Sequence, residues 1–395
     1  MKKKIFYLIS LLMTPILFLI LITAVNIVNL PSKIYTKNDE TVPSIAPIGN
    51  TISQINDSNK YEIKFLGMIP LKSVEVEKVK DLEVCPGGMP IGVRVNSEGV
   101  LIVGYSDIEI NNEKQESPGK TSGLEIGDVI LKVNGIEMHD SRDLSKAIKQ
   151  SDKESIKVDI LRHGENMTKI VQLKKENNKD YKIGLWIRDS TAGVGTITFY
   201  DADSQKFGAL GHPITDSDTN EPFLIKNGNV IESSIISVRK GEKGSPGELK
   251  GIFINESCPN GTIEKNTNSG IFGKIENNKF LKGNIKPMKV GFRDEIVTGK
   301  AKIITTIDEN GPQEYEIEIE KLLNQTSPSS KSMVIKVTDP RLLEKTGGIV
   351  QGMSGSPIIQ NNKIVGAVTH VLINKPDTGY GIYIEWMLQD AEIIK

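Results

Sequence analysis

The chain has 395 residues, and its 49 basic side chains are balanced by 50 acidic ones. Such a balance gives no electrostatic basis for binding nucleic acid, and the length suggests two or three folded units. The two cysteines, Cys85 and Cys258, form neither a metal-binding spacing nor a disulfide framework, so we expect no metal and no cofactor.

The N-terminal stretch has the pattern of a membrane segment. Three lysines, at positions 2–4, precede a long apolar run from Ile5 to Val25. About 20 apolar residues span a bilayer, whereas the apolar part of a cleaved signal is shorter. We therefore expect residues 1–30 to be an uncleaved transmembrane anchor, with a cleaved signal as the alternative. The lysines predict that everything after the anchor is translocated across the membrane. Residues 31–60 are polar and contain prolines, which is typical of a linker.

Residues 61–176 read as a small α/β roll. The sequence predicts a strand at 101–105, a hairpin at Asn134-Gly135, a helix at 141–150 and a closing strand at 155–163. Asp140 or Ser141 is placed to cap the helix.

The run from Gly123 to Gly135, GLEIGDVILKVNG, resembles that of a PDZ domain. The likeness implies a groove between a strand and the helix, where a peptide adds as an extra strand. By position, the loop that holds a terminal carboxylate falls on Pro90, Ile91, Gly92 and Val93. This loop departs from the usual Gly-Leu-Gly-Phe, so a PDZ fold that serves only for packing or regulation is the alternative.

Residues 177–395 are expected to form an all-β domain. They contain many short strand-like runs separated by Gly/Asn turns and little helix, a pattern that predicts a barrel or a sandwich. The whole chain is thus predicted to be mainly β.

The turn Gly352-Met353-Ser354-Gly355-Ser356-Pro357 carries the candidate nucleophile. Glycines on both sides of Ser354 allow a sharp bend that exposes its hydroxyl and lets nearby N–H groups bind an oxyanion. We expect the N–H groups of Gly352 and Ser354 to form this oxyanion hole. A Gly-x-Ser-Gly-x-Pro run followed by a hairpin resembles chymotrypsin-like proteases. The resemblance implies that residues 177–395 form a chymotrypsin-like β-barrel.

A nucleophilic serine needs a base, and the chain has four histidines. His212 lies on a Gly-His-Pro loop and is the preferred base. His370 is a second candidate, although it follows the nucleophile in the sequence. His139 and His163 are read as surface residues.

Asp339 is the expected third catalytic residue. It is the only aspartate between Asp308 and Ser354, and it ends a predicted strand before Pro340. Thr369 is a rival, because a hydroxyl can also orient a histidine ring. Asp216 and Asp218 lie too close to His212 in a turn-like run and are expected to be solvated.

Taken with the anchor and the PDZ-like module, these motifs make the chain resemble the stage IV sporulation protein B family of serine peptidases. By position, the family's catalytic residues fall on His212, Asp339 and Ser354. The resemblance implies a self-cleaving signalling protease, secreted from the forespore and anchored in its membrane. Its protein substrate would be a membrane-bound inhibitor of an intramembrane metalloprotease, and its cleavage would release the late mother-cell sigma factor.

Two other readings remain open at this point. An inactive, membrane-anchored PDZ scaffold would recruit partner proteins but would need neither Ser354 nor His212. An α/β-hydrolase esterase would place its serine in a Gly-x-Ser-x-Gly turn between a strand and a helix. Here Pro357 follows and both flanks are predicted strands.

Overall fold

The computed structural model describes residues 13–14, 33–36, 50–55, 59–65, 67–79, 81–110, 112–151, 154–175, 180–277, 281, 286–323, 325 and 327–394. Apart from Met13 and Thr14, the predicted membrane anchor lies outside these residues. Among the described residues, no helix is long and apolar enough to cross a membrane. The first strands form a small separate sheet in the order β1-β4-β3-β2: β1 (Lys33–Thr36), β4 (Ile69–Lys78), β3 (Lys60–Phe65) and β2 (Asn50–Gln54).

One half of a closed β-barrel is built around a core that includes Ile91, Val95, Ile197 and Phe207. Its strands are β5 (Glu83–Pro86), β6 (Pro90–Tyr105), β15 (Leu185–Tyr200), β16 (Lys206–Ala209), β17 (Ile225–Arg239), β18 (Glu248–Ile254), β19 (Gly261–Thr267) and β20 (Gly270–Ile275).

The second half of the barrel follows in the sequence. Its strands are β21 (Met288–Val290), β22 (Gly299–Thr305), β23 (Gln313–Leu322), β24 (Met333–Val337), β25 (Pro357–Gln360), β26 (Lys363–Leu372) and β27 (Lys375–Tyr383). The short helices η5 (Arg293–Glu295), α4 (Pro340–Thr346) and α5 (Ile384–Asp390) complete it. Strand β23 shows why these residues form a barrel wall, because Tyr315, Ile317 and Ile319 alternate into the core. The turn between β25 and β26 is the predicted one, with Asn361 and Asn362 at φ of 51° and 56°.

A smaller α/β unit holds a core of its own, lined by Ile102, Leu124, Ile130 and Leu144. It contains the second half of β6, β7 (Ile108–Ile110), β8 (Glu113–Gln115), α2 (Pro118–Thr121), β9 (Val129–Val133), β10 (Ile136–Glu137), α3 (Ser141–Lys149), β11 (Ser155–Arg162), β12 (Glu165–Gln172), β13 (Lys174–Lys175) and β14 (Tyr181–Lys182).

Two local predictions in this unit are confirmed. Asn134 and Gly135 have φ of 50° and 82° and join β9 to β10 as a tight hairpin. The helix α3 begins where expected, because the Asp140 side chain accepts hydrogen bonds from the N–H groups of Arg142 and Asp143.

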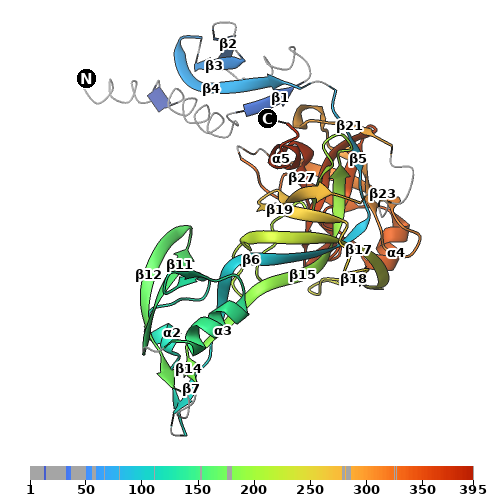
Figure 1. Ribbon diagram of the computed structural model, residues 1–395. Helices are drawn as coiled ribbons and strands as arrows, with labels where there is room; N and C mark the ends of the chain where they lie inside the picture. The colour runs from blue at the N-terminus through green and yellow to red at the C-terminus, as the bar shows by residue number, and fades with distance from the viewer. Residues whose placement is uncertain are drawn as a thin grey trace, which may run out of the picture.

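Strands β6 and β15 run from the barrel into the α/β unit, where they lie side by side (Figure 1). Their pairing extends from Pro90 opposite Thr196 to Tyr105 opposite Leu185. The two units therefore share a pair of continuous strands. The residues predicted as one module, 61–176, are distributed over the small sheet, the barrel and the α/β unit.

The prediction that Pro90, Ile91, Gly92 and Val93 form a carboxylate-binding loop is wrong. These residues are strand, paired with β15 on one edge and, from Ile91 onward, with β17 on the other. A Cβ atom on Gly92 would lie 2.6 Å from the Phe253 ring, so this position is packed inside the barrel. The local sequence resembles a binding loop, but pairing with two strands that are distant in the sequence makes these residues part of the barrel wall.

Candidate active site

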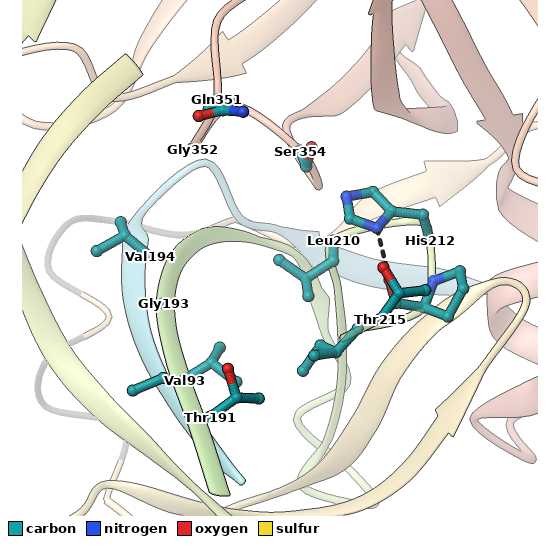
Figure 2. A pocket seen from close by; sticks show the side chains of 13 residues that line it. Val93, Thr191, Gly193, Val194, Leu210, His212, Thr215, Gln351, Gly352 and Ser354 are labelled. Atoms are coloured by element: carbon teal, nitrogen blue, oxygen red, sulfur yellow. Dashed lines mark hydrogen bonds between the residues drawn. The ribbon is translucent and has the colours of Figure 1, made fainter. Parts of the chain in front are cut away.

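A cleft of about 430 Å³ opens between the two halves of the barrel. Figure 2 shows three segments that line it: one face of β15, the loop that carries His212, and the turn that carries Ser354. The lining residues are Val93, Thr191–Val194, Leu210, His212–Thr215, Gln351, Gly352 and Ser354. The structure thus brings together three of the residues predicted for catalysis, Ser354, His212 and Gly352, and it adds Val93, which was predicted for the PDZ loop.

The turn that carries Ser354 is held in place by two threonines of β15. The Thr196 hydroxyl donates to the Gly352 carbonyl at 2.7 Å, and the Thr196 N–H donates to the Ser354 carbonyl at 3.0 Å. The buried Thr198 hydroxyl donates to the Gly355 carbonyl at 2.8 Å. Gly355 has φ of 98°, and a Cβ atom there would lie 2.1 Å from the Thr196 carbonyl oxygen. Only glycine permits this close approach of turn and strand.

Ser354 donates its hydroxyl proton to the Thr369 carbonyl, at 2.8 Å. Within the described part of the chain, the N–H groups of Gly352 and Ser354 donate to no acceptor. Two unpaired backbone donors that flank a nucleophile are the arrangement that an oxyanion hole requires.

His212 is oriented by a backbone carbonyl. Its Nδ1 lies 2.8 Å from the Pro213 carbonyl oxygen, which can only accept, so the proton is on Nδ1. Figure 2 shows this side of the ring turned away from Ser354. The other ring nitrogen, Nε2, is then unprotonated and able to act as a base. Burial lowers the pKa of His212, although the hydrogen bond to Pro213 opposes this effect.

His370 lies directly against His212. The two ring centroids are 4.9 Å apart, with the rings tilted by 44°. Burial, then the neighbouring His212 and Lys331, lower the pKa of His370 to about 4, so its ring is neutral at physiological pH. Its Nδ1 is buried without a hydrogen-bond partner among the described residues. His370 does not line the cleft, which leaves His212 as the base that a substrate meets.

The predicted hydrogen bond between Asp339 and His212 does not form among the described residues. Asp339 caps α4 by accepting from the Arg341 N–H, and it also accepts from the Glu316 N–H at 3.2 Å. The Arg341 guanidinium donates to both carboxylate oxygens and lowers the pKa of Asp339 to about 2. The sequence placed Asp339 correctly at a strand end but gave no sign that Arg341, two residues later, would pair with it.

We therefore predict that Asp339→Asn keeps near-wild-type turnover. Asparagine retains the cap, but it presents an NH2 group in place of Oδ2, which accepts from the Glu316 N–H and the Arg341 guanidinium. The unfolding free energy should therefore fall because the Asp339 side chain is buried, whereas turnover should not change. Peptidase assays and urea denaturation of the same preparation check this. A loss of turnover on the order of 10⁴ with unchanged stability would restore Asp339 as the group that orients His212.

Three other sequence-based expectations can be compared with the structure. The Thr369 hydroxyl donates to the Ser330 carbonyl at 2.6 Å, so it points at backbone, and only the Thr369 carbonyl reaches the site.

The expectation that Asp216 is solvated is wrong. It is 2% exposed and accepts from Arg188, Thr219 and Asp218. His139 and His163 line no part of the cleft, and the side chain of His163 is 78% exposed.

The cleft in the barrel holds a serine with unpaired backbone N–H groups beside it, together with a neutral histidine. This combination is that of a serine peptidase. The sequence model of the SpoIVB peptidase S55 family matches residues 179–388, and the chain belongs to that family. A PDZ domain model matches residues 87–173, which confirms the predicted PDZ module in a mainly β chain.

Solved structures similar to this chain include proteases. One is the active form of the Rv3671c protease from M. tuberculosis, at 13% identity and a TM-score of 0.28, covering 51% of this chain and 74% of that one. Another is the HtrA-type protease AlgW with a decapeptide, at 12% identity and a TM-score of 0.29, covering 52% and 53% of the two chains. No protein with a curated description matches the chain.

Proposed function

We propose that this serine peptidase is the signalling endopeptidase of sporulation. In this role it acts in the space between forespore and mother-cell membranes and cleaves a membrane-bound inhibitor of an intramembrane metalloprotease. The cleavage activates the late mother-cell sigma factor, and the enzyme also cleaves itself. The observation that supports peptide cleavage most directly is the convergence of Ser354, His212 and two unpaired amides on one cleft.

The chemistry follows from this geometry. The Ser354 Oγ leaves the Thr369 carbonyl and attacks the peptide carbonyl carbon while Nε2 of His212 takes its proton. The N–H groups of Gly352 and Ser354 stabilise the negative oxygen of the tetrahedral intermediate. His212 then gives the proton to the departing amine. Water hydrolyses the acyl-enzyme by the same steps, with His212 again acting as the base.

The proposed location rests on the N-terminal sequence. An apolar run after three lysines supports a single-pass anchor with the peptidase outside the cytoplasm. Protease added to intact forespores whose outer membrane has been removed should then digest the barrel. A barrel protected in the cytoplasm would contradict this part of the proposal.

The pH dependence of activity should be that of a buried histidine with no carboxylate partner among the described residues. Activity requires His212 without its second proton, and burial lowers the pKa of His212 from its ordinary value of 6.5. The ratio kcat/KM should therefore stay level as the pH falls to about 6.5 and decline only below it. A profile measured from pH 4.5 to 8 checks this. An inflection above pH 7 would indicate a carboxylate beside the ring.

The signalling role is tested by reconstitution. Vesicles that contain an intramembrane metalloprotease and its membrane-bound inhibitor are incubated with the full-length chain or with its Ser354→Ala form. We expect cleavage of the inhibitor only by the unmodified chain. The alternative, an inactive PDZ scaffold, predicts binding to the vesicles and no Ser354-dependent cleavage of either the inhibitor or the chain itself.

A further inference from the structure

The small sheet before the barrel carries an apolar hairpin tip. The tip lies where the chain turns from β3 into β4, and we define it as Met68, Ile69, Pro70 and Leu71. Met68, Ile69 and Leu71 are 77%, 57% and 40% exposed, and Pro70 is exposed as well. By contrast, Ile63, a few residues earlier in β3, is fully buried. A run of neighbouring apolar side chains that faces water marks an interaction surface.

The strand register places this tip at the end of the sheet where the chain enters it. Strand β1 pairs in parallel with β4, with Lys33 opposite Glu75. Because the two strands run in the same direction, the start of β1 points toward the start of β4 at Ile69. The chain that leads into β1 therefore comes from the side of the hairpin tip.

The lengths of chain on this side place the tip at the depth of a membrane surface. Ile69 lies six positions before Glu75 in β4, which is roughly 20 Å of strand. Three residue steps separate Lys33 from position 30, where the predicted anchor ends, and they span at most about 10 Å. Since Lys33 lies opposite Glu75, the tip extends roughly 10 Å past the end of the anchor. Apolar groups that bind at a membrane surface are buried to a similar depth, about 5–10 Å.

The opposite end of the sheet is attached to the barrel. Tyr35 is buried as part of the barrel core, and its ring stacks on Phe292 with the centroids 6.3 Å apart. The Thr36 hydroxyl donates to the Asp294 carboxylate at 3.3 Å. The sheet therefore lies between its apolar tip and the barrel that carries Ser354, so the orientation of the tip also determines that of the barrel.

We propose that the hairpin tip inserts into the surface of the membrane that the anchor crosses and, together with the anchor, holds the barrel in one orientation over the lipid. Lipid is the expected partner because the anchor keeps the tip beside a membrane. Lys64 and Lys72 flank the tip, and lysines beside inserted apolar groups favour anionic lipid. Lys64 pairs with Glu62 at 3.2 Å, so apolar contact contributes most of the binding. This inference rests on the anchor in the proposed function.

Insertion is measured by the fluorescence of a tryptophan at the tip. Met68→Trp is introduced into the full-length Ser354→Ala chain, which prevents self-cleavage, with Trp186→Phe to remove an exposed native tryptophan. The other tryptophan, Trp386, is buried in the barrel. In phosphatidylcholine and phosphatidylglycerol vesicles with brominated acyl chains, Met68→Trp should lose at least about half of its emission, because bromine quenches an indole that reaches the acyl chains. Emission as bright as in unbrominated vesicles overturns the proposal.

Glu75→Trp in the same background is the matched control. Glu75 is exposed on the same strand, and the roughly 20 Å between it and the tip keeps it outside the acyl region. We expect little quenching at this position. Equal quenching of Glu75→Trp and Met68→Trp would mean that the whole sheet lies on the lipid, and it overturns insertion by the tip.

A charge at the tip should prevent insertion. Ile69→Asp, added to the Met68→Trp chain, should remove the quenching, because a carboxylate is costly to bury in the acyl region. Ser73→Asp, at an exposed position further along β4, should leave the quenching in place. Circular dichroism checks the folding of both variants. Quenching that persists in a folded Ile69→Asp protein overturns the assignment.

Two further readouts separate this inference from its alternatives. A blue-shifted Met68→Trp emission that brominated lipid does not quench would mean that protein, such as a second copy of the chain, covers the tip, and it overturns the membrane contact. Extraction with alkaline carbonate tests the anchor independently. Release of a chain whose tip is quenched would reject the anchor and keep the tip contact. Retention of a chain whose tip is not quenched would reject the tip contact and keep the anchor.

Discussion

Ser354→Ala is expected to abolish cleavage, with a loss of turnover of about 10⁴–10⁶. The variant removes the nucleophile from a turn whose shape depends on Thr196, Thr198 and Gly355, so the fold should survive. Self-cleavage of the full-length chain and labelling of the serine by a fluorophosphonate measure the effect.

Ser356→Ala is the matched control, two residues along the same turn. The Ser356 hydroxyl is fully buried and donates to the Met353 carbonyl at 2.7 Å. Its loss should cost about 1 kcal/mol of unfolding free energy and leave most of the activity. Activity that survives Ser354→Ala and disappears in Ser356→Ala would place the nucleophile at Ser356.

The second large effect is expected at His212. His212→Gln should reduce turnover by about 10⁴ or more, because glutamine cannot take the serine proton. His370→Gln should reduce it far less, since His370 contacts the His212 ring but does not line the cleft. Both variants are measured on one peptide. A larger loss in His370→Gln than in His212→Gln would make His370 the base.

Features that depend on neighbouring residues could be predicted from the sequence. The Asn134-Gly135 hairpin, the Asp140 cap and the bend around Ser354 each follow from the backbone preferences of a few adjacent residues. The choice of His212 as the candidate base used the same kind of local evidence, a histidine held between glycine and proline.

Features that depend on distant pairing could not be predicted. Pro90–Val93 looked like a binding loop, yet pairing with β15 and β17, which follow about a hundred or more residues later, makes it a barrel strand. Asp339 was chosen by its order in the chain, which says nothing of Arg341 and Glu316 as partners.

The shared strands β6 and β15 also determine how this protein can be divided. The chain enters the barrel before residue 90, last pairs with barrel strand β17 at Ser97, and returns at Ser190, which pairs with Asn96. A fragment that starts at residue 179 would lack β6, the strand between β15 and β17, and would expose two open edges to aggregation. Joining Asn96 to Ser190 by a short hairpin turn would instead excise the PDZ unit and keep both strands paired. The smallest peptidase that can be made from this sequence is therefore a discontinuous one, with residues from both sides of the excised unit.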